Sequence, residues 1–123
     1  FASVILENQG KGKFLMRPLP IEAQVSSVND ILMEDFNEDG NIDLVIAGNL
    51  YATEVETTRN DAGVGMYLEG DGKGDFNPIS PAESGFFLPG DVKKLKTVKS
   101  KKDRFVMAVL NDGASVGFDV NKK

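Results

Sequence analysis

The sequence contains no histidine, no cysteine and no tryptophan. The absence of histidine and cysteine excludes imidazole general bases, thiol nucleophiles, zinc fingers and disulfides within this chain. No apolar run approaches the roughly 18 residues needed to cross a bilayer, so we expect no membrane span. The side chains left for chemistry are carboxylates, amides, hydroxyls, lysine and arginine. These suit hard cations with oxygen ligands better than they suit most kinds of catalysis.

The remaining composition is that of a soluble globular protein. The 123 residues are 41% hydrophobic and 27% charged, which is too apolar for a disordered tail. The formal net charge of -5 argues against non-specific nucleic-acid binding, which depends on cations that contact phosphates. The chain opens on Phe1 with a strand-like segment and neither an initiator methionine nor a basic leader, so we expect the gene product to begin upstream.

Two parts of the sequence repeat each other. Segments 6–14 and 68–76 share Leu-Glu at the start, Gly-Lys-Gly in the middle and Phe at the end, and they lie 62 residues apart. The same spacing relates Asn49 and Asn111, each of which closes an apolar run. A period of about 62 residues predicts roughly two copies of one structural unit, and units of this order are typical of propeller blades or solenoids.

The apolar runs are short and are separated by Gly, Pro, Asn and Asp, with no sustained helical period. This pattern predicts an all-β protein. The run 42–47 alternates less than the others, so we expect a strand that is buried on both faces. With the repeat, the strands fit about two four-stranded antiparallel blades of a partial β-propeller.

The strongest local signal is the segment 35–43, which we call the acidic loop. Oxygen-bearing side chains occupy its first, third, fifth and ninth positions, and glycine occupies the sixth; these residues are Asp35, Asn37, Asp39, Asp43 and Gly40. Such spacing wraps a tight turn around one hard cation, with the carbonyl of Asn41 pointing inward, and its mixed ligands favour Ca²⁺ over Mg²⁺. An EF-hand is excluded, because its twelfth position needs a glutamate and is Ile46 here, and because the flanks are strand-like.

The segment 35–45, followed by 70–76, resembles the FG-GAP or VCBS repeat, which forms blades of integrin-α-like β-propellers and binds Ca²⁺ between two strands. The segment 48–63 is similar to bacterial members of the Bacteroidetes type. The resemblance implies that 1–20 ends one blade, that 21–80 is a complete calcium-binding blade and that 81–123 is a degenerate final blade without a metal site. It also implies a ligand set, namely Asp35, Asn37, Asp39, Asn41 and Asp43.

Two further features have less specific interpretations. A basic run, made of Lys93, Lys94, Lys96, Lys99, Lys101, Lys102 and Arg104, could attract an acidic polysaccharide or lipid, but lysines that keep an exposed strand edge soluble explain it better. It replaces the acidic loop in the second copy, so we expect a plain hairpin there. Glu54 and Glu56 lie in the longest predicted loop, where an acid pair could act in catalysis, although an ordered, ion-paired loop is the favoured interpretation.

The resemblance, together with the acidic loop, implies a non-catalytic calcium-binding β-propeller module of a secreted, periplasmic or cell-surface bacterial protein. Its expected partners are a protein or a glycan, together with the remaining blades of the parent chain or other copies of itself. We expect no nucleic-acid partner. The alternative is that these are the C-terminal blades of a larger propeller enzyme that acts on polysaccharide or lipid, with its catalytic residues upstream.

Overall fold

The computed structural model describes residues 2–24, 27–48, 63–111 and 113–120. These residues form nine strands, which are β1 (Val4–Gly10), β2 (Lys13–Pro18), β3 (Val28–Glu34), β4 (Asp43–Gly48), β5 (Met66–Gly70), β6 (Phe76–Ile79), β7 (Val92–Lys99), β8 (Arg104–Leu110) and β9 (Val116–Asp119). One turn of 3-10 helix, η1 (Ile21–Gln24), and one turn of α-helix, α1 (Pro81–Ser84), complete the described elements. The all-β prediction is therefore confirmed.

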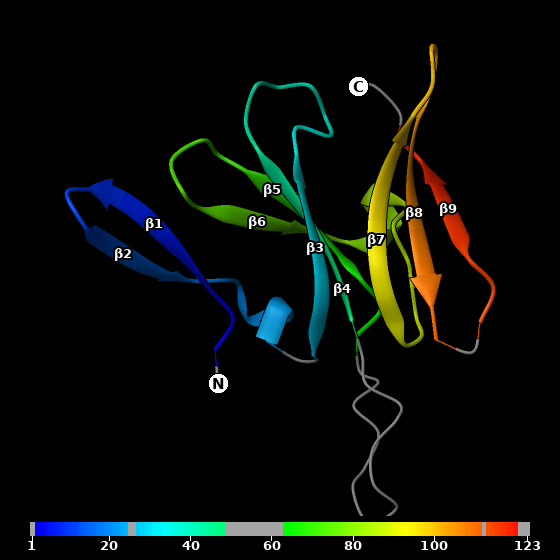
Figure 1. Ribbon diagram of the computed structural model, residues 1–123, viewed down its shortest axis with the longest axis horizontal. Coiled ribbons are helices and arrows are strands. Elements are labelled where there is room, and N and C mark those ends of the chain that lie inside the picture. The colour runs from blue at the N-terminus through cyan, green and yellow to red at the C-terminus, as the bar shows by residue number, and fades with distance from the viewer. Residues whose placement is uncertain (1, 25–26, 49–62, 112, 121–123) are drawn as a thin grey trace, which may run out of the picture.

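The strands form three antiparallel sheets, in the orders β1-β2, β3-β4-β5-β6 and β7-β8-β9. Figure 1 shows the four-stranded sheet between the other two. About two four-stranded blades were expected, and the described residues form one sheet of four strands, with a sheet of three on one side and a two-stranded hairpin on the other. That these sheets are blades of a partial β-propeller stays a prediction. Strands β1 and β2 lie within 1–20, β3 to β6 within 21–80 and β7 to β9 within 81–123. The division of the chain into blades at these boundaries stays a prediction.

The short helix α1 was not expected from the sequence. Ser80 caps its first turn by accepting a hydrogen bond from the Glu83 N–H, and Pro81 begins the helix, where a missing N–H costs nothing. Gly85 ends it in the left-handed conformation at φ 73°. The capping residues are readable in the sequence, but a single turn is too short to show a helical period. In the part of the chain that is described, no helix is long and apolar enough to cross a membrane.

Strand β4 lies at the centre of the packing, and all six of its residues are buried. Leu44 and Ile46 face a cluster that includes Leu19, Ala23 and Leu68, on the side of the β1-β2 hairpin. The alternate residues of β4 face a second cluster with β7 and β8, and they are Val45 and Ala47. Successive side chains of a strand point to opposite faces. The expected burial of this run on both faces is confirmed.

The edges of the four-stranded and three-stranded sheets meet along β3 and β7, which lie side by side (Figure 1). Side chains of β3 join the two edges, because Asp30 Oδ2 accepts a hydrogen bond from the Leu95 N–H at 2.7 Å and Asn29 Nδ2 donates to the Val92 carbonyl at 2.7 Å. Lys94 Nζ lies 3.2 Å from the same carboxylate oxygen of Asp30. Side chains of β3 therefore provide hydrogen-bond partners for backbone groups at the outer edge of β7.

Asp30 should make the stability of the protein depend on acid pH. Burial alone would raise the pKa of Asp30, but the Leu95 N–H and the Lys94 ammonium outweigh it and hold that pKa below its ordinary value. The stabilisation is therefore present at neutral pH and is lost as the pH falls below about 4. We expect Asp30→Asn to lower the free energy of unfolding by about 1–2 kcal/mol at pH 7, measured in urea. The difference should shrink toward pH 2, and an equal difference at both pH values would contradict this.

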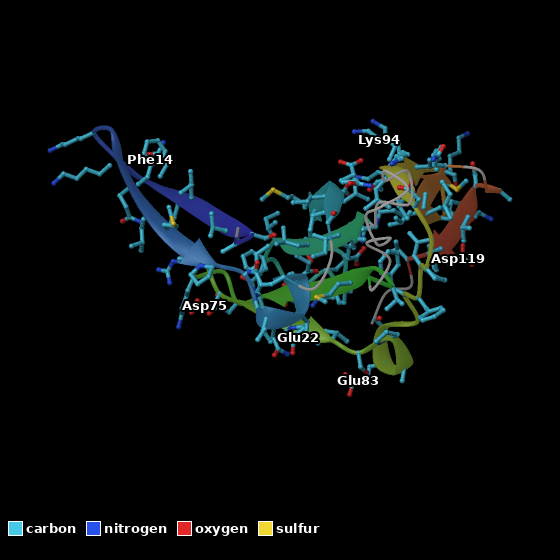
Figure 2. The ribbon with its side chains drawn as sticks, turned by 90° about the horizontal axis from the view of Figure 1, so that it is seen from below. Phe14, Glu22, Asp75, Glu83, Lys94 and Asp119 are labelled. Carbon is cyan, nitrogen blue, oxygen red and sulfur yellow. The ribbon has the colours of Figure 1, made fainter. Side chains whose placement is uncertain are left out.

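The β1-β2 hairpin projects from the rest of the molecule. Leu6, Phe14 and Met16 are 58%, 61% and 64% exposed, and Figure 2 shows Phe14 far from the other two sheets. Arg17 fixes the base of the hairpin through Glu7 at 2.8 Å and Asp75 of the β5-β6 turn at 3.5 Å. The hairpin is thus packed on the four-stranded sheet at one end and uncovered at the other.

Candidate metal centre

The acidic loop connects β3 to β4, and its oxygen-bearing side chains turn toward its own backbone. The N–H of Asp39 lies 3.1 Å from both Asp35 Oδ1 and Asn37 Oδ1, and Asp35 Oδ2 accepts a hydrogen bond from the Gly40 N–H at 2.9 Å. Because the Asp35 and Asn37 oxygens share one donor, they lie close together. The structure therefore brings the first and third predicted ligands to one point inside the loop.

The glycine at the sixth position of the acidic loop allows the backbone to make the tight turn that the ligand spacing requires. Gly40 has φ 91°, a conformation that strains any side chain, and nothing lies within 4 Å of where its Cβ would be. Backbone geometry, and not lack of space, therefore selects glycine here. The neighbouring Glu38 also has a positive φ of 62°, so two of the loop's residues depart from the usual backbone region.

Asp39, the fifth position, is held in its ionised form by the loop itself. Its Oδ1 accepts a hydrogen bond from the Asn41 N–H at 2.8 Å, and Asn37 Nδ2 lies 3.2 Å from its Oδ2. The Asn41 N–H in particular lowers the pKa of Asp39. A carboxylate that stays charged is the form that a cation needs.

Asp43, the ninth position, has a structural role that sequence reasoning missed. Its side chain is fully buried at 0% exposure. Oδ2 accepts hydrogen bonds from the Phe36 N–H at 3.0 Å and the Tyr67 hydroxyl at 2.8 Å, and Oδ1 accepts one from the Gly70 N–H at 3.0 Å. Burial and the Asp43 carboxylate both raise the pKa of Tyr67, so its hydroxyl remains a donor. Asp43 thereby ties the start of the acidic loop to strand β5.

The two remaining predicted positions differ in what the structure shows. The Asn41 side chain lies against the β5-β6 turn, because a Cβ on Gly72 would stand 2.3 Å from Asn41 Oδ1. Three of the roughly four lone-pair sites of the Asp43 carboxylate are in use. The assignment of all five side chains as metal ligands, Asn41 and Asp43 included, stays a prediction.

The donor set has the chemistry that Ca²⁺ prefers, with two carboxylates and one amide oxygen in a loop of correct spacing. Among the described residues, no three acidic or other strong metal-ligating side chains converge as a metal group. The reason is visible in the loop, where Asn37 supplies an amide oxygen and Asp43 turns toward backbone donors. The side-chain oxygens of Asp35, Asn37 and Asp39 therefore have the chemistry that suits a cation. Asp43 holds the loop in place through its hydrogen bonds to Phe36, Tyr67 and Gly70.

The basic run lies on the neighbouring sheet, and much of it pairs with acids. Lys93 contacts Asp91 at 2.7 Å, Lys94 contacts Asp30 at 3.2 Å, and both Lys99 and Arg104 lie 3.7 Å from Glu34. A short turn joins β7 to β8, closed by a 2.8 Å hydrogen bond from the Ser100 N–H to the Asp103 carbonyl. The plain hairpin expected at this place is present. Glu54 and Glu56, in contrast, lie outside the described residues.

Comparisons with known protein families, curated proteins and solved structures find no match to this chain. The interpretation of the acidic loop therefore depends on its own geometry and chemistry.

Proposed function

We propose that this chain is a calcium-binding β-propeller module of the FG-GAP type, non-catalytic, from a secreted, periplasmic or cell-surface bacterial protein. Its role is to bind a protein or a glycan, with further blades or other copies of the chain beside it. The observation that carries the proposal is the inward orientation of Asp35, Asn37 and Asp39 around the amides of one short loop.

The electrostatics of the loop support a bound cation. Asp35 and Asp39 place two carboxylates in one loop of nine residues, where each accepts hydrogen bonds from backbone N–H groups of the loop. A cation bound between them would offset the repulsion of two like charges. A bound Ca²⁺ would supply that neutralising charge and would tie the end of β3 to the start of β4. The Asp43 contacts with β5 would extend this effect into the four-stranded sheet.

The strand positions support a propeller-like repeat. At the 62-residue spacing, β1 and β2 correspond to β5 and β6, and β3 and β4 correspond to β7 and β8. The four-stranded sheet also carries a packed neighbour on each face, as a blade does within a propeller. Both features are what a chain cut from a row of similar blades would show.

Removal of Ca²⁺ tests the proposed metal site. A ligand at a hundred times its dissociation constant stabilises a fold by about 2.7 kcal/mol, so excess EDTA should lower Tm by roughly 10 °C. Asp39→Ala should melt near the EDTA value of the wild type and should no longer respond to EDTA. Thermal melts followed by circular dichroism, with and without millimolar Ca²⁺, measure both effects.

Asp71→Ala is the matched control for that experiment. Asp71 also folds a glycine-containing turn, by accepting hydrogen bonds from the N–H groups of Lys73 at 2.7 Å and Asp75 at 3.1 Å. Its loss should lower Tm slightly and leave the response to EDTA intact. A wild-type Tm that EDTA does not change would contradict the metal role.

The enzyme alternative rests on the same resemblance, which places the catalytic residues upstream of this segment. A cleavage assay on the full-length gene product, with polysaccharide and phospholipid substrates, distinguishes the two functions. Cleavage by the full-length protein would replace the binding role with the enzymatic one.

A further inference from the structure

Arg104, the first residue of β8, reaches from the three-stranded sheet to the acidic loop. Its Nη2 donates a hydrogen bond to the Phe36 carbonyl at 3.0 Å, and its guanidinium lies 5.4 Å from the centre of the Phe36 ring. Its Nη1 lies 3.7 Å from Glu34 Oε2. Arg104 therefore contacts the residues on both sides of Asp35, the first predicted ligand.

Phe36 connects Arg104 to the buried part of the loop. The Phe36 N–H donates to Asp43, and the Phe36 ring meets the Tyr67 ring edge-on with 6.3 Å between their centres. The Tyr67 hydroxyl in turn donates a hydrogen bond to the Asp43 carboxylate. Phe36 is only 6% exposed, so Arg104 contacts a residue whose position is already fixed by packing.

We propose that Arg104 is a positioning residue for the acidic loop. Through this contact, Arg104 couples cation binding at Asp35, Asn37 and Asp39 to the packing of the three-stranded sheet against the loop. This inference rests on the proposed calcium function. Arg104 fixes the backbone around Asp35, so that the Asp35 oxygens are already oriented when the cation arrives. By reciprocity, cation binding must strengthen the contact between the loop and β8.

The charge of Arg104 and its positioning role predict opposite results. As a nearby positive charge, the guanidinium repels Ca²⁺, so its removal would tighten binding if charge dominated. As a positioning group, its removal loosens the loop and weakens binding. Groups that orient metal ligands typically change affinity by about 10–100-fold, whereas the charge of Arg104 is partly offset by the Glu34 carboxylate 3.7 Å from its Nη1.

Calcium titration of Arg104 variants by isothermal titration calorimetry tests the proposal. Arg104→Lys keeps the charge but loses the planar fork and the stacking on Phe36, and Arg104→Gln loses the charge as well. We expect both to weaken Ca²⁺ binding about tenfold. Lys102→Gln is the control, because it removes a charge from the same hairpin at an exposed residue whose described hydrogen bond uses only its backbone N–H. Its affinity should stay within twofold of the wild type.

The outcomes separate this proposal from the calcium function. If the wild type takes up no Ca²⁺, the proposed function fails. If the wild type binds Ca²⁺ and Arg104→Lys binds equally well, or Arg104→Gln binds more tightly, only the positioning role fails.

A measurement on the wild type avoids any variant that does not fold. Ca²⁺ should slow hydrogen exchange of the backbone amides in 99–104 as well as in 35–43, because the coupling acts in both directions. Slower exchange confined to 35–43 would overturn the proposal.

Discussion

Replacing Asp43 by alanine should destabilise the protein by about 3–5 kcal/mol, the largest effect expected of a single polar substitution in the described part of the chain. The carboxylate is fully buried, and it accepts hydrogen bonds from Phe36, Gly70 and Tyr67. Each buried donor left without an acceptor costs about 1–3 kcal/mol. Alanine would strand two backbone N–H groups and a hydroxyl at once. Urea unfolding at pH 7 in the presence of EDTA measures the effect without a contribution from a cation.

Asparagine at the same position should also destabilise the protein, although it has nearly the shape of aspartate. Both carboxylate oxygens of Asp43 face N–H donors, from Phe36 on one side and from Gly70 on the other. An amide presents one oxygen and one NH₂ group, so one donor would meet another donor in either orientation. Asp119→Asn is the control on an exposed strand residue, and it should change stability by no more than about 0.5 kcal/mol. A stability for Asp43→Asn equal to that of the wild type would contradict the assigned role.

Leu68→Ala should cost about 3 kcal/mol, within the 2–5 kcal/mol typical of buried leucines. Leu68 is 0% exposed and packs with Leu44 and Ile46 of β4 in the cluster under the β1-β2 hairpin. The cost combines the lost burial with the cavity that remains, because neighbouring strands close it only in part. The same urea titration gives the value.

Leu6 is the matched control for Leu68, because the two leucines occupy the same place in the 62-residue repeat. Leu6 is 58% exposed on the uncovered hairpin, so Leu6→Ala should cost less than about 1 kcal/mol. A comparable loss in both variants would mean that the outer hairpin face is covered in solution, for instance by another copy of the chain.

The sequence predicts the strands and the acidic loop well because both signals are local. A short apolar run bounded by Gly, Pro or Asp is enough to indicate a strand, and β4 shows the expected burial on both faces. The spacing of Asp35, Asn37, Asp39 and Gly40 similarly determines a tight turn from within, through side chains that bond to amides two to five residues away.

The contacts that join one sheet to another could not be predicted in this way. Asp30 pairs with Leu95 and Lys94 across 64 or 65 residues of sequence, and Arg104 reaches Phe36 across 68. The basic run looked like a solvated edge, but four of its residues make ion pairs. Such contacts depend on how sheets pack, which no local pattern encodes.

Asp43, Leu68 and Leu6 illustrate the difference between what the sequence determined and what the tertiary structure decided. The sequence by itself determined an all-β chain and a glycine-dependent acidic turn that carries oxygen-bearing side chains and no histidine or cysteine. Only the tertiary structure decided that Asp43 faces the amides of Phe36 and Gly70, and that Leu68 is buried while its counterpart Leu6 is not. The physical reason is that local bonding fixes a turn, whereas burial depends on which other sheet covers a residue.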